Sequence, residues 1–329
     1  MTRVTTRERG VAIVTVLLIV ALVATLAASL LWREWVAVRD VENQRVATQT
    51  MWIERAAVEW ARAELRLQTS TSGITQPAQR WAAPVQDTKL ADLLPADVVS
   101  VNSDLEHATI SGEVEDAQAK FNLMNLVTRP GPSAPFQVDV DGLAAYRRLL
   151  SGAGLDPALA KPTADHLLRA LAIGPRNGNS SDADDWPLQP TSIDDFASVP
   201  GYDPHTISTL APLVTVLPDT TTINANTASP DVLAAAIPTL THGQADALIN
   251  RRNTAYFVST GDVATTLYST LGNGQLPLGS IVGVTSGYFI VHCRIRSERI
   301  NMRMDTLIAR YGIGDFSWTV VTWVHRLSG

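Results

Sequence analysis

The chain has 329 residues, of which 46% are hydrophobic and 18% are charged, and its formal net charge is −6. This length suits roughly two domains, and the apolar share is sufficient for a sizeable core. The negative net charge argues against broad electrostatic binding to nucleic acid or to anionic lipid.

An uncharged apolar segment lies near the N-terminus. Residues 11–31 contain no charged residue, glycine or proline, and a helix of about 20 such residues crosses a bilayer core. Arg3, Arg7 and Arg9 precede the segment, which by the positive-inside rule favours a cytoplasmic N-terminus. Three arginines also follow it, but long C-terminal domains are translocated largely regardless of charge. We therefore expect a single-pass protein whose body lies outside the cytoplasm.

Two other interpretations of this segment stay open. A cleaved secretory signal has a shorter apolar region followed by an A-x-A site, and no clean site of that kind follows residue 31. A plain signal anchor is the other alternative.

The helical pattern continues beyond the apolar segment. No glycine or proline occurs between residues 11 and 72, and Val46, Ile53, Trp60 and Leu67 recur every seven residues. This spacing predicts an amphipathic helix over residues 32–72 that extends the membrane helix. We expect its apolar stripe to pack on the chain's own sheet or on a partner helix.

The junction at Arg9-Gly10-Val11 resembles the type IV prepilin signal, in which a short basic leader ending in Gly precedes a long apolar helix. In that family a prepilin peptidase cuts after the Gly, so the resemblance implies that residues 1–10 are a leader and that the mature chain starts at Val11. Taken alone, Gly10 is also compatible with an ordinary helix start.

Most pilins and pseudopilins carry Glu at the fifth mature position, where this chain has Thr15. A carboxylate in the bilayer costs about 2.5–3.5 kcal/mol unless it is paired. In the family this Glu is thought to pair with the N-terminal amine of a neighbouring subunit. In lacking this Glu, the chain resembles the protein K family of type II secretion. The resemblance implies a subunit that sits first in the filament, at its tip, with no preceding subunit to pair with.

The middle of the chain changes from strands to helices. Residues 98–101 and 108–114 have the composition of short strands, and a Pro/Gly linker follows at 129–137. Helical periodicity then predicts two pairs of helices. These helices are expected at residues 140–153, 157–172, 228–237 and 242–251.

Two stretches in this region resemble protein K. Residues 116–126 (DAQAKFNLMNL) are similar to a hallmark of that family, and residues 221–229 (TTINANTAS) contain a second such motif. Judged by its pattern alone, the first stretch is a strand that ends in a turn. The helix pairs are similar to helix-hairpin-helix or SAM-like modules.

The C-terminal region returns to the alternating pattern of strands. Residues 287–295 and 299–310 alternate apolar and polar side chains, and residues 317–327 are expected as a third strand. Short turns between the three strands predict an antiparallel meander. The expected fold class is α+β, with a long N-terminal helix, a pilin-like antiparallel sheet and an inserted helical domain. The expected boundaries are a head at 73–128, an insert at 129–283 and a second part of the head at 284–329.

The sequence contains no local signature of an enzyme. The six histidines lack metal-ligand spacing, and no nucleotide fingerprint or catalytic motif is present. Asp182, Asp184 and Asp185 form the densest acidic patch, and such a loop suits Ca²⁺. Proteins of the K family carry calcium near this region, usually after an acidic run that is missing here. A solvated acidic loop is the alternative.

The resemblance to protein K covers essentially the whole chain. It implies a minor pseudopilin at the tip of the type II secretion pseudopilus, anchored in the bacterial inner membrane with its C-terminal domain in the periplasm. The implied partners are I- and J-type minor pseudopilins, the inner-membrane platform and prepilin peptidase, with no nucleic acid. The alternative is a competence-type DNA receptor, in which Arg251 and Arg252 contact phosphate.

Overall fold

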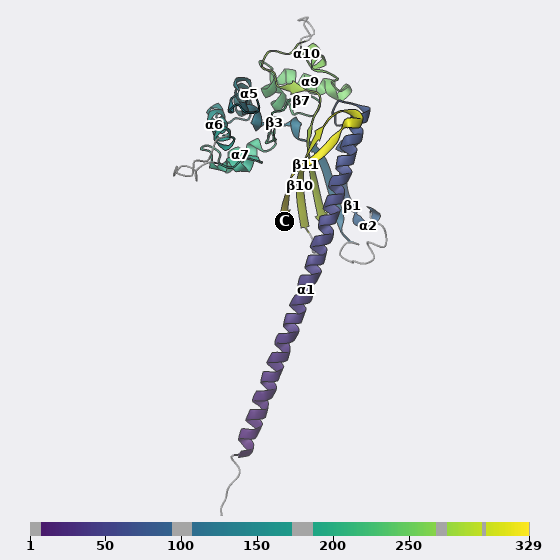
Figure 1. Ribbon diagram of the computed structural model, residues 1–329, viewed down its shortest axis with the longest axis vertical. Coiled ribbons are helices and arrows are strands. Elements are labelled where there is room, and N and C mark those ends of the chain that lie inside the picture. The colour runs from purple at the N-terminus through teal and green to yellow at the C-terminus, as the bar shows by residue number, and fades with distance from the viewer. Residues whose placement is uncertain (1–7, 94–106, 173–186, 268–274, 298–300, 329) are drawn as a thin grey trace, which may run out of the picture. The chain divides into compact units, whose positions relative to one another are not determined.

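The computed structural model describes residues 8–93, 107–172, 187–267, 275–297 and 301–328. The chain divides into two compact units, residues 1–57 and residues 58–329. The long helix α1 (Glu8–Thr71) runs from the first unit into the second (Figure 1).

In the first unit, α1 is long and apolar enough to cross a membrane, judged by length and composition. Large apolar side chains from Ile13 to Leu31 are more than half exposed, as expected of a helix surface that faces lipid. The hydroxyls of Thr15, Thr25 and Ser29 donate to carbonyls three residues earlier, at 2.8–2.9 Å. The polar atoms of these side chains are thus satisfied without water.

The second unit contains a five-stranded antiparallel sheet in the order β1-β2-β9-β10-β11. Its strands are β1 (Val85–Lys89), β2 (Thr109–Asp116), β9 (Tyr288–Arg296), β10 (Asn301–Tyr311) and β11 (Trp318–Ser328). The predicted C-terminal meander is confirmed. The expectation for residues 98–101 lies outside the described residues. β1 was not expected from the sequence, because five residues with two charges form a strand only through pairing with β2.

The periodicity of β9 correctly identified its buried face. Phe289, Val291, Cys293 and Ile295 are all less than 5% exposed, and Trp81 packs edge-on against Phe289 at 5.2 Å between ring centroids. Cys293 is therefore a small core residue.

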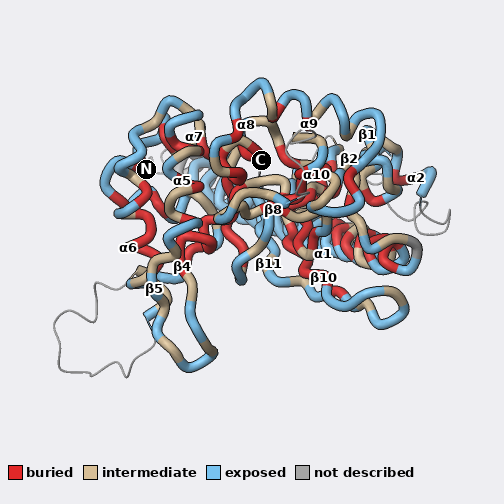
Figure 2. Tube along the Cα trace, turned by 90° about the horizontal axis from the view of Figure 1, so that it is seen from above, coloured by how far each residue is buried: buried red, intermediate tan, exposed pale blue. Residues whose placement is uncertain are grey.

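The described residues of 117–287, between β2 and β9, form a helical insert. Its α-helices are α5 (Val140–Gly152), α6 (Ala160–Ala170), α7 (Pro204–Leu210), α8 (Pro230–Ala236), α9 (His242–Thr254) and α10 (Thr260–Leu267). Its short strands pair as β3 (Phe121–Asn122) with β6 (Val214–Thr215), β4 (Val127–Thr128) with β5 (Gln137–Val138), and β7 (Ile223–Asn224) with β8 (Val282–Gly283). Buried residues gather inside the insert, whereas its outer loops are exposed (Figure 2).

The core of the insert begins earlier in the chain than the sequence suggested. Phe121, Leu123, Met124, Leu126 and Val127 belong to the same buried cluster as the helices. The sequence pattern predicts residues 121–128 in the head, because Phe121 and Leu123 alternate as in a strand. Pairing of β3 with β6 draws them into the insert instead.

Candidate functional site

The predicted processing site lies at the start of α1. Gly10 and Val11 are helical, and α1 begins before them at Glu8. The Thr15 hydroxyl donates to the Ala12 carbonyl at 2.9 Å, so its donor is satisfied within the apolar helix. Cleavage after Gly10 stays a prediction.

The part of α1 that belongs to the second unit has two apolar faces. Val58, Ala61 and Leu65 are buried, with exposed fractions of 7%, 1% and 0%. Their spacing of three and four residues places them on one side of the helix. Trp60 and Leu67 are 47% and 61% exposed. Trp60 and Leu67, the C-terminal end of the predicted stripe, therefore do not belong to the core. They form an exposed apolar helix surface that a partner chain could cover. The other two stripe residues, Val46 and Ile53, lie in the first unit.

The two family-like stretches meet in a buried hydrogen-bond network centred on Asp116, which is 4% exposed. Asp116 Oδ2 accepts from Asn224 Nδ2 at 2.9 Å, Thr227 Oγ1 at 2.6 Å and Ser286 Oγ at 2.7 Å. Asp116 Oδ1 accepts from the backbone N–H of Gln118 at 3.0 Å. Burial raises the pKa of Asp116, and these four donors act to lower it.

Arg310 extends this network to α1. Its guanidinium donates to the Leu65 carbonyl at 3.1 Å, to Gln68 Oε1, to Thr75 Oγ1 at 3.1 Å and to the Ser286 carbonyl at 2.6 Å. Burial lowers the pKa of Arg310 to about 10, and the charge of Asp116 acts in the opposite direction, so the side chain stays charged at neutral pH.

Thr75 and Ser286 connect the two halves of the network. Asn224 Nδ2 donates to the Thr75 carbonyl at 3.1 Å, and the Ser286 backbone N–H donates to Thr75 Oγ1 at 3.1 Å. The end of α1, the sheet and both connections into the insert are therefore joined in one buried cluster.

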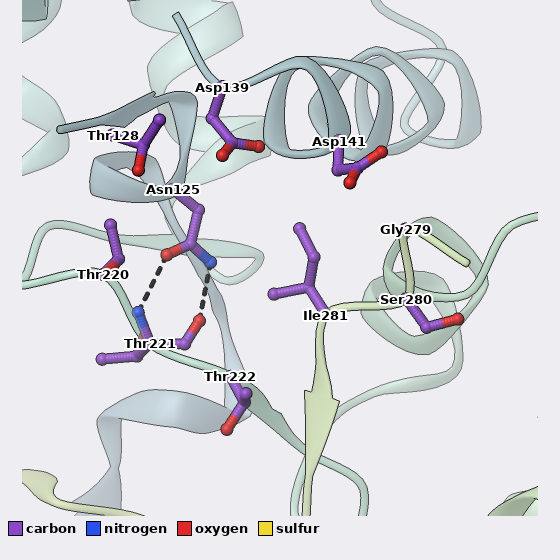
Figure 3. A pocket seen from close by; sticks show the side chains of 10 residues that line it. All are labelled: Asn125, Thr128, Asp139, Asp141, Thr220, Thr221, Thr222, Gly279, Ser280 and Ile281. Atoms are coloured by element: carbon purple, nitrogen blue, oxygen red, sulfur yellow. Dashed lines mark hydrogen bonds between the residues drawn. The ribbon is translucent and has the colours of Figure 1, made fainter. Parts of the chain in front are cut away.

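The asparagines of residues 116–126 are also structural. Asn122 Nδ2 donates to the Asp219 carbonyl at 2.7 Å. The Asn125 side chain donates to the Thr221 carbonyl at 2.8 Å and accepts from its backbone N–H at 2.9 Å (Figure 3). Both amides fix the segment that follows β6. The repeated asparagines were the available sequence signal, but their partners lie about 96 residues away.

A polar cavity of about 410 Å³ lies beside Asn125. Asp139, Asp141 and Ser280 are among its lining residues (Figure 3). One of these carboxylates already caps a helix, because Asp139 Oδ1 accepts from the Gly142 backbone N–H at 2.7 Å. No set of three metal-ligating side chains occurs among the described residues. The predicted calcium ligands Asp182, Asp184 and Asp185 lie outside that part of the chain, so calcium binding there stays a prediction.

The arginines that the DNA-receptor alternative requires bind the chain's own backbone. Arg251 donates to the Ala255 carbonyl at 2.5 Å. Arg252 donates to the carbonyls of Ala225 and Ala228 at 2.9 and 2.6 Å, and burial lowers its pKa. A phosphate-binding arginine presents its donors to the ligand, whereas these two guanidinium groups donate to helix and loop carbonyls.

Two family models match this chain, one over residues 119–219 and the other over residues 223–276. Both are described as type II secretion system protein K. The type II secretion system protein K of Pseudomonas aeruginosa is 26% identical over 304 residues, covering 83% of this chain and 82% of the relative. The chain belongs to the type II secretion system protein K family. It is therefore a minor pseudopilin of type II secretion, and the DNA-receptor alternative is not favoured.

Two further matches agree with this assignment. The protein K of Pectobacterium carotovorum is 25% identical over 323 residues, covering 88% of this chain and 89% of the relative. The fold matches a chain in the crystal structure of the GspK-GspI-GspJ complex from the enterotoxigenic Escherichia coli type 2 secretion system. That match has a TM-score of 0.64 at 20% identity and covers 88% of this chain and 99% of the other. It confirms the predicted α+β fold class.

Proposed function

We propose that this protein K family member sits at the tip of the pseudopilus, where it initiates or caps assembly by binding other minor pseudopilins through α1. The exposed apolar face at Trp60 and Leu67 carries this proposal. Both side chains lie on a helix whose opposite face already packs on its own head, so burying them requires another chain.

I- and J-type minor pseudopilins are the proposed partners. The crystallised protein of the same fold is part of a GspK-GspI-GspJ complex. Thr15 supports a terminal position, because the apolar segment at residues 11–31 carries no carboxylate with which to pair a preceding subunit.

The apolar segment is proposed to anchor the chain once through the inner membrane, with residues 32–329 in the periplasm. Prepilin peptidase would remove residues 1–10, and the inner-membrane platform would receive the mature chain. Intact-mass analysis of protein taken from membranes tests the processing step, with a chain that starts at Val11 as the expected result. A chain that retains residues 1–10 contradicts it.

A structural role without catalysis agrees with the hydrogen bonding of the buried polar groups described above. The buried carboxylate Asp116 and the buried guanidinium of Arg310 are both used in bonds within the chain. The family motifs therefore serve architecture, and the proposed activity is assembly.

Co-purification of the full-length chain with I- and J-type subunits from membranes tests the proposal. The double variant Trp60→Lys, Leu67→Lys should lower recovery of both subunits at least about tenfold, because two charges would enter an apolar interface. Leu278→Lys is the matched control, since Leu278 is 98% exposed on the insert.

Both variants should keep the wild-type unfolding midpoint, because all three side chains are exposed. Recovery of the partners by the double variant at the wild-type level would show that this face of α1 is not the contact.

A further inference from the structure

Two tryptophans follow the apolar segment directly on α1. Trp32 is the first residue after the uncharged run at 11–31, and Trp35 lies about one helical turn further on. Their ring centroids are 5.4 Å apart and the rings are tilted by 31°. The two side chains are 66% and 53% exposed, so the chain itself leaves both indoles largely uncovered.

Arg39 completes this aromatic cluster. The spacing of three and four residues from Trp32 to Trp35 and from Trp35 to Arg39 places all three side chains on one face of the helix. The guanidinium carbon of Arg39 lies 5.4 Å from the centroid of the Trp35 ring, and Arg39 Nη1 also pairs with Glu42 Oε2 at 3.2 Å. The charge of Arg39 is therefore largely offset, and the two indoles dominate the cluster.

The length of the apolar segment determines the depth at which this cluster lies in a bilayer. As a helix, residues 11–31 span about 31 Å, which matches a hydrocarbon core of about 30 Å. The headgroup layer adds about 5–7 Å on each side, and Trp35 lies about 6 Å beyond Leu31 along the helix axis. Both indoles therefore fall in the headgroup layer, which accommodates an apolar ring and a polar N–H together.

The two ends of the apolar segment are flanked differently. On the N-terminal side there is no aromatic residue, and the four charged residues all lie within the leader at residues 1–10 that the proposed processing removes: Arg3, Arg7, Glu8 and Arg9. On the C-terminal side the tryptophans remain in the processed chain. The mature helix would thus keep its interfacial aromatic side chains at one end.

We infer that Trp32 and Trp35, with Arg39 stacked on them, bind the headgroup layer of the periplasmic leaflet and fix the depth of α1 in the bilayer. This rests on the proposed function, because it takes residues 11–31 as the segment that crosses the inner membrane. The occupant of this helix face is the lipid interface, because the length of the apolar segment alone sets the cluster at that depth. The indoles, and not a net positive charge, make the contact, so zwitterionic lipid is sufficient.

Fluorescence quenching of the full-length chain in phosphatidylcholine liposomes tests the position of the cluster. The lipids carry bromine on the acyl chains either near the headgroup or near the bilayer centre. The signal of the pair is the fluorescence that is lost in the Trp32→Phe, Trp35→Phe variant. Bromine near the headgroup should quench this signal at least about twofold more strongly than bromine near the centre.

Trp52 is the matched control for the position. Arg55 lies over its ring at 5.8 Å, as Arg39 does over Trp35, and the side chain is 59% exposed. Trp52 is, however, about 31 Å beyond Leu31 along the helix. Its fluorescence, obtained as the difference between wild type and Trp52→Phe, should be the same in both brominated lipids and in unbrominated lipid.

A second measurement tests whether the pair fixes the depth. Ser29→Cys, in a Cys293→Ser background, reports contact with water through its reaction with a membrane-impermeant maleimide. Adding Trp32→Ala and Trp35→Ala should raise the reaction rate at least about fivefold, because the helix then samples a wider range of depths. Adding Trp52→Ala should leave the rate unchanged.

The outcomes separate this inference from the proposed membrane anchor. If bromine at the centre quenches as strongly as bromine near the headgroup, or if the reaction rate is unchanged without the two indoles, the inference is wrong and the anchor stands. Absence of quenching in a chain that floats with the liposomes also overturns it and places the pair clear of the bilayer, where a partner helix would cover it. A wild-type chain that does not float with the liposomes defeats the proposed anchoring itself.

Discussion

The insert contains two modules that use the same local chemistry and differ in what they are attached to. The first spans residues 121–216 and the second residues 223–284. Each opens with a two-residue strand whose second residue is an asparagine, Asn122 or Asn224, and each strand pairs in parallel with a strand near the end of its module. In both, the asparagine Oδ1 accepts the backbone N–H two residues further on, at 3.1 and 3.0 Å.

The amide nitrogens of these two asparagines have different partners. Asn122 Nδ2 binds Asp219, in the segment between the modules. Asn224 Nδ2 binds Thr75, Asp116 and Ser286, at the junction with α1 and the sheet. The second module is thus bonded directly to the head through Asn224 Nδ2, whereas Asn122 Nδ2 in the first module donates only to the connecting segment. The repeated asparagine motif therefore keeps the same local geometry in both modules but connects each module to a different segment of the chain.

The largest expected effect is therefore that of Asn224→Ala. This change removes a donor from the buried carboxylate of Asp116 and leaves the Thr75 carbonyl without its amide donor, which should lower the free energy of unfolding by about 3 kcal/mol. Exchange should accelerate in the last turns of α1 as well as in the second module. Denaturant unfolding with hydrogen exchange measures both effects.

Asn122→Ala is the matched variant. Its destabilisation should be confined to the first module and the connecting segment, with α1 unaffected. If both variants gave the same exchange pattern, the inferred difference between the two asparagines would be wrong. That difference is that Asn224 links its module to α1 and the sheet, whereas Asn122 links its module to the connecting segment.

The next effect concerns the turns between helices. Gly201 has φ +94°, and a Cβ there would lie 2.3 Å from Leu159 Cδ2. Gly201→Ala should therefore lower the free energy of unfolding by about 2–3 kcal/mol, from backbone strain and overpacking. Thr239 occupies the corresponding turn of the second module with φ +64°. Thr239→Ala should change stability far less, and equal losses would argue against this equivalence of the turns.

Thr239→Gly should stabilise the protein. A β-branched residue at positive φ is strained by about 1–2 kcal/mol, and glycine removes that strain while increasing the entropy of the unfolded chain. The expected net gain is about 0.5–1 kcal/mol in denaturant unfolding. A loss of stability would show that the Thr239 side chain contributes more than its backbone strain costs.

The smallest expected effect is a pH dependence that distinguishes the modules. His166 in α6 is 4% exposed and packs near Phe196, with ring centroids 5.3 Å apart. Burial lowers its pKa below the ordinary value of about 6.5, so the unfolded state binds the proton more readily. Stability of the first module should therefore fall as the pH drops below about 6.5.

Hydrogen exchange across this pH range, corrected for intrinsic rates, should show the decline in the first module only, because the described part of the second module has no buried histidine. His166→Leu should abolish the dependence. A decline that persists in this variant would assign it to another group.

The sequence by itself determined those helices and strands whose patterns depend only on residues close together in the chain. The absence of glycine and proline from residues 11–72 specified α1, and strict alternation specified β9 and its buried face. The motif stretches identified the family. These signals suffice because helix continuity and strand alternation depend on neighbouring residues.

Only the tertiary structure decided which face of α1 is buried, that residues 85–89 pair as a strand, and what the motif residues do. In the sequence, Trp60 and Leu67 are as apolar as Ala61 and Leu65. Only one face of the helix packs on the head, and it is the face of Ala61 and Leu65. Arg310 binds Gln68 across 242 positions of sequence. Burial and hydrogen bonding between such distant segments depend on the completed fold, because no local pattern encodes the partner.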